Sequence, residues 1–467
     1  MTVKPPLLVA GVDSSTQNCK LVVVEAASGV VVRSTSVPHP DGTEVDPQLW
    51  WDAFHATGAH DLRGVAALSI TAQQHTTLFL GGDGEPVRDA ILWNDGRAAK
   101  AGNDLCREGG GAERWAHRIG LVPAAAHPIS KLRWLRDSEP EAADRVRRVM
   151  LPHDWLTWGL LGRASEPTTD YSDASVTGYW SLPDAAYRPE LIELALGRQA
   201  SAPRALGPSD RAGVTDRGMV VGAGCGDNAA AALGLGAATG EAVVSIGTSM
   251  TVSIRREGGV ADATGFVDDM HDAQGLHLPM VATLNGARTF IAAARLLRTG
   301  LDDLAGLAAA APADAGGLTF LPYLDGERNP LMPHSTGALL GLTRNNMTPE
   351  NVARAAVLGV ACAVARATDG LERAGVRIGS LVAVGGAARL DSLCQAMADL
   401  TGKRVERPEQ REYAALGAAR QAAWALTGEL PEWVPPARNV FEPNCGAAWP
   451  AAVRSRHDEA TGTLFGA

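Results

Sequence analysis

The sequence predicts an α/β protein of two domains, and three observations support this prediction. A chain of 467 residues is too long for one compact core, so two domains of ordinary size are expected. Each half begins with two apolar runs joined by a short polar turn, which suggests a duplicated domain. In the second half, apolar runs typical of strands alternate with helical patterns, which is typical of α/β architecture.

In the first half, the apolar run Leu7–Asp13 predicts a strand. The turn SSTQN follows, then a second strand in KLVVVEA and a third in ASGVVVRSTSV. Further along, SKLRWLRDSEPEAADRV predicts a helix, a turn and a second helix. The segment SEPTTDYSDASVTGYW is rich in Ser, Thr and Asp, and it predicts a loop.

In the second half, Val243–Ile246 and Thr251–Ile254 predict a second strand–turn–strand unit. A long helix is predicted from Pro349, because Thr348 is a good N-cap, apolar residues recur every three or four positions, and Gly375 suits the end. After it we expect a strand over Leu381–Val384, a GGAA turn and a helix that ends near Gly402.

The composition excludes several classes of protein. A hydrophobic content of 46% with 20% charged residues indicates a globular chain. The net charge of −10, without a Lys/Arg cluster, argues against a nucleic-acid partner. The six scattered cysteines lack zinc or disulfide spacing, so a reducing compartment is expected. Asp13 interrupts the first apolar run too early for a signal peptide, and no uncharged run reaches membrane-helix length, so we expect a cytoplasmic protein without a membrane partner.

The segment MVVGAGCGDNAAAALGLG contains a glycine pattern found in NAD-dependent dehydrogenases. That interpretation is disfavoured, because no acidic residue for a ribose follows about 20 residues later, and because Asp227 would repel a pyrophosphate at the helix N-terminus. Asp227 itself leaves two alternatives open. It is either a helix cap only, or a general base for an alcohol, helped by Asn228 and by glycines that let a ligand approach.

A second group of polar residues suits phosphate binding. Asp13 ends an apolar run, where a charge is costly unless it is used. It either caps the turn or orders the water shell of Mg²⁺. Donors for phosphate oxygens are offered by the hydroxyl groups of Ser14, Ser15 and Thr16, by the ammonium group of Lys20, and by the turn Gly247–Ser249. Neither a GxxxxGK[ST] motif nor the protein-kinase HRD and DFG signatures occur.

These segments together resemble the FGGY carbohydrate kinases, most closely their xylulokinase members, over nearly the whole chain. GVDSSTQNCKLVVV resembles their first phosphate hairpin, SIGTS the second, and VAVGGAAR the adenosine-binding turn. ITAQQH with AILWNDGR resembles the sugar-binding region, GCGDNAAAALGLG the segment of the catalytic aspartate, and FLPYLDGERNP a characteristic loop. PISKLRWLRD and GALLGLTRNNMTPENVARAAV are similar to the two family signatures.

The resemblance implies two actin-like (ribonuclease H-like) domains of the sugar kinase/heat-shock protein/actin superfamily, 1–237 and 238–467, with the active site in the cleft between them. It implies ATP- and Mg²⁺-dependent phosphorylation of a ketose, with D-xylulose giving D-xylulose 5-phosphate. Sugar and ATP would be the partners, and a homodimer is one expected assembly. By position, it implies Asp227 as the base, Gln74, His75, Asp227 and Asn228 as sugar contacts, Asp13 for magnesium through water and for phosphate, Thr16, Lys20, Gly247 and Thr248 for ATP phosphates, and Gly385 and Gly386 for adenosine.

Some positions depart from the family pattern. Ser15 stands where many relatives have Gly, Gln74 replaces a common Met, Thr76 replaces a common Gly, and the adenosine turn is GGAA. Because of the changes at Gln74 and Thr76, the identity of the sugar substrate is not determined, and ribulose, gluconate or erythritol are alternatives. The Arg-Glu pair of glycerol kinases is absent near position 75. A catalytically inactive actin-like sugar sensor is a further alternative, which the retained aspartates and lysine disfavour.

Overall fold

The computed structural model describes residues 5–466, and the chain divides into two compact units. Unit 1 contains the chain up to Ala237 together with 256–278 and 411–435, and unit 2 contains the remainder. The sequence assigned all of 238–467 to one domain. The contacts instead place two segments of that range with unit 1, so each unit is built from more than one stretch of chain.

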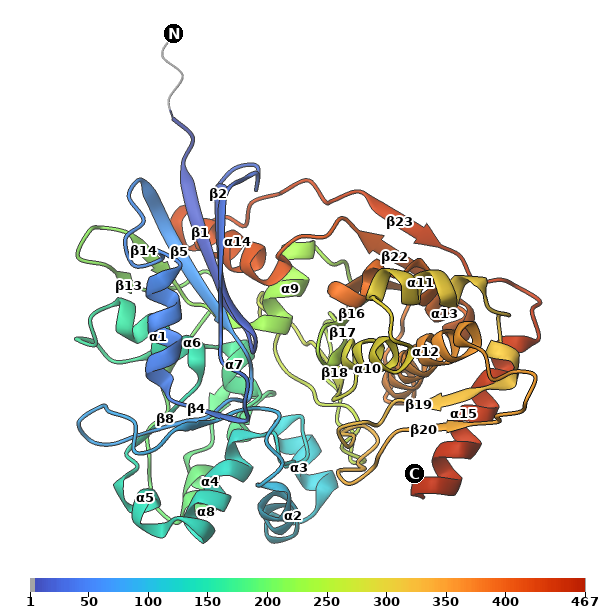
Figure 1. Ribbon diagram of the computed structural model, residues 1–467. Helices are drawn as coiled ribbons and strands as arrows, with labels where there is room; N and C mark the ends of the chain where they lie inside the picture. Colours follow the sequence, from blue (N-terminus) through green and yellow to red (C-terminus); the bar gives the residue numbers. More distant parts are fainter. Residues whose placement is uncertain (1–4, 467) are drawn as a thin grey trace. The chain divides into compact units, whose positions relative to one another are not determined.

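Unit 1 is organised around a seven-stranded sheet of order β13-β14-β5-β1-β2-β3, with β15 also paired to β5 (Figure 1). β1 is antiparallel to β2, and β2 to β3, which confirms the predicted hairpin and third strand. β5 is parallel to β1, β14 and β15. The strands are β1 (Leu8–Ser14), β2 (Asn18–Glu25), β3 (Val31–Pro38), β5 (Val65–Ala72), β13 (Arg211–Val214), β14 (Val220–Gly222) and β15 (Cys225–Gly226).

The two faces of this sheet are covered differently. On one face, Val12 belongs to an apolar cluster with Trp50 of α1 (Pro47–Ala56) and Trp155 of α6 (Pro152–Leu160). On the other face, Gly11 lies against α14 (Tyr413–Thr427), and a Cβ there would be 1.9 Å from the Ala415 oxygen. Only glycine permits this close approach. The contact is a physical reason why 411–435 belongs to unit 1.

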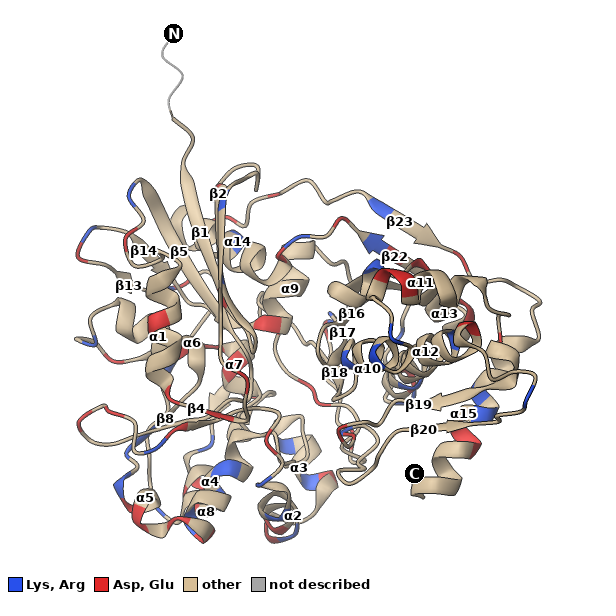
Figure 2. Ribbon diagram, in the orientation of Figure 1, with Lys and Arg blue, Asp and Glu red and all other residues tan. Residues whose placement is uncertain are grey.

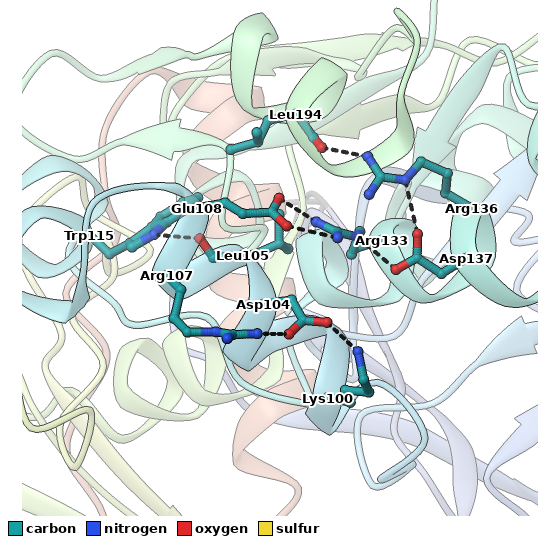
Figure 3. A network of polar contacts seen from close by, with 10 residues as sticks. All are labelled: Lys100, Asp104, Leu105, Arg107, Glu108, Trp115, Arg133, Arg136, Asp137 and Leu194. Atoms are coloured by element: carbon teal, nitrogen blue, oxygen red, sulfur yellow. Dashed lines mark hydrogen bonds and ion pairs between the residues drawn. The ribbon is translucent and has the colours of Figure 1, made fainter.

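A second layer of unit 1 contains the predicted helix–turn–helix, which the structure confirms as α4 (Pro128–Ser138) and α5 (Pro140–Arg145). Arg133 of α4 donates to both carboxylate oxygens of Glu108 on α2 (Ala99–Glu108), at 2.5 and 2.9 Å (Figure 3). This bidentate geometry is the strongest arrangement for an arginine–carboxylate pair, so it anchors α4 to α2. The remaining elements of unit 1 are β4 (Glu44–Val45), β6 (Leu78–Leu80), β7 (Ala90–Ile91), α3 (Ala112–Ile119), β8 (Arg148–Met150), β9 (Thr168–Asp170), α7 (Tyr171–Ser175), β10 (Trp180–Ser181), β11 (Ala186–Tyr187), α8 (Pro189–Leu196), β12 (Arg204–Leu206) and α9 (Asp227–Leu235).

Unit 2 has a six-stranded sheet of order β18-β17-β16-β21-β22-β23. The predicted second hairpin is confirmed, because β16 and β17 are antiparallel, while β16 and β21 are parallel. The strands are β16 (Glu241–Ile246), β17 (Met250–Ile254), β18 (Met280–Thr283), β21 (Ser380–Val384), β22 (Arg404–Pro408) and β23 (Arg438–Phe441). The other elements are α10 (Arg288–Leu297), α11 (Leu301–Ala310), η1 (Ala315–Gly317), β19 (Thr319–Leu321), β20 (Ala338–Leu340), α12 (Pro349–Arg373), η2 (Gly386–Arg389), α13 (Asp391–Thr401) and α15 (Trp449–Phe465).

The long helix α12 begins and ends as the sequence predicts. The Thr348 side chain accepts from the Asn351 N–H, and Gly375 has a φ of +83° just beyond the last turn. By length and composition α12 could cross a membrane, but 89% of its most apolar window is buried inside the protein. Its buried surface extends well beyond the single predicted stripe, so α12 is a core helix of unit 2.

Candidate active site

Several of the predicted site residues of unit 1 lie where neighbouring parallel strands end. Asp13 of β1 and Cys225 of β15 both pair with Thr71 of β5. The chain then continues from β5 into Gln74, and from β15 into Asp227. Since the carboxyl ends of parallel strands are where α/β proteins bind ligands, the topology brings together residues that are far apart in the sequence.

Asp227 is the first residue of α9, and it does not cap this helix. The N-cap is Gly226, without a side-chain hydrogen bond, so the cap-only interpretation is wrong. Asp227 Oδ1 accepts from both the backbone N–H and the Nδ2 of Asn228, each at 2.8 Å. Burial, with the neighbouring carboxylates of Asp13 and Asp173, outweighs the hydrogen bonds from Asn228 and raises the pKa of Asp227 to about 8. A carboxylate with a pKa near the working pH is well suited to accept a proton.

The turn after β5 carries two of the predicted sugar contacts in a restrained conformation. His75 has a φ of +61°, a left-handed conformation that costs free energy for a side chain with a Cβ. Lys131, which is fully buried on α4, donates from Nζ to the His75 oxygen at 2.7 Å and to the Ile91 oxygen at 3.1 Å. The buried ammonium group therefore anchors the strained turn to β7.

Asp13 has the properties expected of a group beside a hydrated cation. It is 5% exposed, and its Oδ1 is buried without a hydrogen-bond partner. Burial raises its pKa to about 7, although the nearby Lys20 ammonium group lowers it. Lys20 Nζ lies 2.6 Å from the Glu412 carboxylate, and Thr16 Oγ1 accepts a hydrogen bond from Trp93 at 2.9 Å. Two of the polar groups predicted to hold phosphate therefore already have protein partners.

In unit 2 the two predicted nucleotide turns lie side by side. Gly247 and Thr248 follow β16, Gly385 follows β21, and these strands are parallel with Ser245 opposite Val384. Gly385 has a φ of +90°, and a Cβ there would be 2.6 Å from the oxygen of the last residue of β16. Backbone N–H groups of the segment before α10 donate to the carbonyls of Gly247 and Thr248, at 2.7 and 3.1 Å, and thus hold the turn.

A group of buried acidic residues, Asp154, Asp170 and Asp173, was not predicted from the sequence. The predicted loop 165–180 in fact contains β9 and α7, because Asp170 accepts from the N–H groups of Ser172 and Asp173 and caps α7. Figure 2 shows an acidic residue in α7 and another at the start of α9, in segments that are otherwise uncharged. On α6, His153 Nδ1 lies 2.5 Å from Asp173 Oδ2. The signals available in the sequence were the short D-x-x-D pattern and the His-Asp pair in LPHDW.

Comparison with known proteins identifies the family. Residues 8–234 match the model of the N-terminal domain, and 242–426 the model of the C-terminal domain, of the FGGY family of carbohydrate kinases. The xylulose kinase of Streptomyces coelicolor is 42% identical over 438 residues, which are 90% of this chain and 89% of the relative. The xylulose kinase of Streptomyces rubiginosus is 42% identical over 443 residues, or 91% and 89% of the two chains.

Solved structures agree with this result. The crystal structure of xylulose kinase from Bifidobacterium adolescentis is 35% identical, with a TM-score of 0.85 and coverage of 98% of this chain and 100% of that chain. The predicted fold class of two actin-like α/β domains is thereby confirmed, and the dehydrogenase alternative is wrong. The protein is a xylulokinase-like enzyme. The chain belongs to the FGGY family of carbohydrate kinases.

Proposed function

We propose that this enzyme transfers the γ-phosphoryl group of ATP to the terminal hydroxyl of a ketose, with D-xylulose as substrate and D-xylulose 5-phosphate as product. Similarity to xylulose kinases that are 42% identical supports the substrate. The observation that carries the chemistry is the position of Asp227, directly after β15, near the Asp13 carboxylate and bonded to Asn228, which in turn donates to Gln74.

In this mechanism Asp227 acts as the general base. Its Oδ1 is occupied by two hydrogen bonds from Asn228, so Oδ2 is the atom that accepts the sugar proton. The sugar oxygen forms its bond to the γ-phosphorus while the bond to the leaving ADP breaks. Little covalent chemistry is left to the protein, so catalysis comes from positioning and electrostatic stabilisation.

The remaining predicted residues bind and orient the substrates. Gln74, His75 and Asn228 would contact the sugar. The ATP phosphates would be held by Thr16, Lys20, Gly247 and Thr248, and the adenosine by Gly385 and Gly386. Asp13 would hold Mg²⁺ through water, which agrees with its buried Oδ1 that lacks a protein donor. When bound, Mg²⁺ would neutralise charge on the phosphate oxygens.

A sugar panel with a coupled ADP assay tests the proposal. D-xylulose should give the highest kcat/KM, ahead of D-ribulose, gluconate, erythritol and glycerol. A higher kcat/KM on another compound of the panel would identify that compound as the substrate in place of D-xylulose. This is the alternative that Gln74 and Thr76 leave open. Binding of sugar and ATP without ADP release would instead support an inactive sensor.

The variant Asp227→Asn tests the base. It should fold normally and lose about 10²–10⁴-fold in turnover, the usual contribution of a general base. The variant Glu190→Gln, which removes an exposed charge paired with Arg118, is the matched control. Near-normal turnover of Asp227→Asn would contradict the assignment.

A further inference from the structure

Two fully buried polar residues behind the proposed base have no part in the mechanism described so far. His153 and Asp173 are both 0% exposed, and His153 Nδ1 lies 2.5 Å from Asp173 Oδ2. His153 Nε2 lies 3.3 Å from Asp154 Oδ1. The distance of 2.5 Å is that of a short hydrogen bond between this nitrogen and oxygen. It is too short for two ligands of one metal ion, which would be separated by about 3 Å. Burying charged groups is costly unless they are paired and hydrogen-bonded, and these three side chains meet that condition only through one another and their immediate neighbours.

A continuous line of hydrogen bonds leads from this pair to the base. Asp173 Oδ1 accepts from Gln74 Nε2 at 3.3 Å, and Gln74 Oε1 accepts from Asn228 Nδ2 at 3.2 Å. Asn228 Nδ2 also donates to Asp227 Oδ1 at 2.8 Å. We call His153, Asp173, Gln74 and Asn228 the relay.

The chemistry of the groups gives the relay one direction. An ionised carboxylate can only accept hydrogen bonds, so Asp173 selects the NH₂ end of the Gln74 amide. The Gln74 oxygen then faces Asn228, and this in turn selects the NH₂ end of the Asn228 amide. The Asn228 NH₂ is thereby aimed at Asp227 Oδ1, so that the orientation of the base follows from the acceptor role of the Asp173 oxygen.

The glycines of the GAGCGDN segment support the same arrangement independently. Gly224 has a φ of +82°, and a Cβ there would be 2.5 Å from His153 Cδ2. A Cβ at Gly226 would be 2.2 Å from Gln74 Nε2. The two glycines that resemble a dinucleotide motif in sequence are therefore the positions where the backbone contacts two members of the relay.

The surroundings of His153 favour a permanent charge. Burial lowers the pKa of His153, but the carboxylates of Asp154 and Asp173, with a further contribution from Asp170, outweigh this and raise the pKa to about 10. At neutral pH the imidazolium ring thus carries protons on both nitrogens. It donates to Asp173 and keeps that side chain in the role of an acceptor.

We propose that His153 and Asp173 are positioning residues for phosphoryl transfer, which hold the Gln74 amide in one orientation and thereby align Asn228 and Asp227 with the sugar hydroxyl. The inference rests on the proposed function, because it needs Asp227 to be the base. It adds two residues that touch no substrate, and it gives Gln74 a structural task in addition to its contact with the sugar.

A double-mutant cycle separates positioning from a general effect on folding. The variant Asp173→Ala should lower kcat/KM for the sugar about 10–100-fold, the range expected when a buried hydrogen-bond partner is lost, while the KM for ATP stays within about 2-fold. Asp173→Asn should recover only part of the loss, because its amide oxygen can still accept from Gln74 while its NH₂ group would face the Nδ1–H donor of His153. The control Glu190→Gln should leave every parameter unchanged.

The decisive variant is Asp173→Ala in a Gln74→Met background, where the relay is already interrupted. We expect little further loss of sugar kcat/KM there. An equal loss in both backgrounds would overturn the proposal, since it would mean that Asp173 acts on the fold and not through Gln74. If Asp173→Ala does not fold, His153→Gln with and without Gln74→Met runs the same cycle.

The outcome also separates this inference from the proposed function. A wild-type enzyme that phosphorylates sugar but shows additive losses would refute the relay alone. A wild-type enzyme without sugar-dependent ADP release would refute the proposed function, and the same cycle would then be measured on sugar binding by calorimetry. Equal changes in binding free energy in the two backgrounds would again overturn the relay.

Discussion

The raised pKa of Asp227 predicts that the proposed catalytic base destabilises the fold. Its folded carboxyl titrates at about 8 instead of 3.8, so the folded protein binds this proton more tightly than the unfolded chain does. The free energy of unfolding should therefore fall as the pH rises from about 4 to about 8, and stay lower above that range. The variant Asp227→Asn carries no charge at any of these pH values and should escape the loss.

The magnitude follows from the same pKa. If the whole difference between a pKa of 3.8 and one of about 8 is converted at about 1.4 kcal/mol per pKa unit, the loss in free energy of unfolding has an upper bound of about 6 kcal/mol. Asp227 is only partly buried, so solvent screens the charge, and we expect a gain of about 1–3 kcal/mol for Asp227→Asn at pH 9. The substitution retains the hydrogen bonds from Asn228, because the amide oxygen can accept both of them.

Thermal and urea unfolding of the ligand-free wild type and variant at pH 5, 7 and 9 measure this effect. The difference between the two proteins should be smallest at pH 5 and largest at pH 9, while Glu190→Gln should show no such trend. A variant that is less stable than the wild type at pH 9 would refute the reasoning. A difference that does not change with pH would refute it equally, because it would not come from the titration of this carboxyl group.

Two further substitutions test how the predicted binding turns are held. Lys131→Met removes the donor to the His75 oxygen, so the strained turn should relax and the sugar KM should rise about 10-fold, with a stability loss of about 1–3 kcal/mol and an unchanged ATP KM; an unchanged sugar KM would contradict this anchoring role. Gly286→Ala places a Cβ 2.5 Å from the Ser249 oxygen, so the turn at Gly247 should shift and the ATP KM should rise about 10-fold in steady-state kinetics. A change confined to the sugar KM would argue against the assignment of that turn to phosphate.

Much of the local structure could be predicted because its causes are local. Apolar runs joined by short polar turns specified the two hairpins, β1–β2 and β16–β17. Thr348 and Gly375 specified the ends of α12 through a side-chain cap and a left-handed residue. The family could be identified for a related reason, since its motifs are continuous segments that keep their order along the chain.

Other features depend on contacts between segments that are distant in the sequence, and no local sequence pattern predicts them. The association of α14 with β1 and α9 follows from backbone approaches at Gly11 and Gly417, where Cβ atoms would lie 1.9 Å from carbonyl oxygens. Gly11 lies in β1 and Gly417 in α14, and neither has a positive φ, so the backbone conformation does not require glycine at either position. Only the packing explains why glycine is needed there. The division of 238–467 between the two units has the same origin.

By itself, the sequence determined the α/β class, the hairpins, the long helix, the family and the identity of Asp227 as a candidate base. The tertiary structure alone decided that Asp227 is no helix cap, that Lys131 anchors His75, and that His153 and Asp173 connect to the base through Gln74 and Asn228. The physical reason is that hydrogen bonds between buried side chains form only when β5, α6, α7 and α9 pack together. Their partners are then set by three-dimensional proximity, which residue spacing along the chain does not encode.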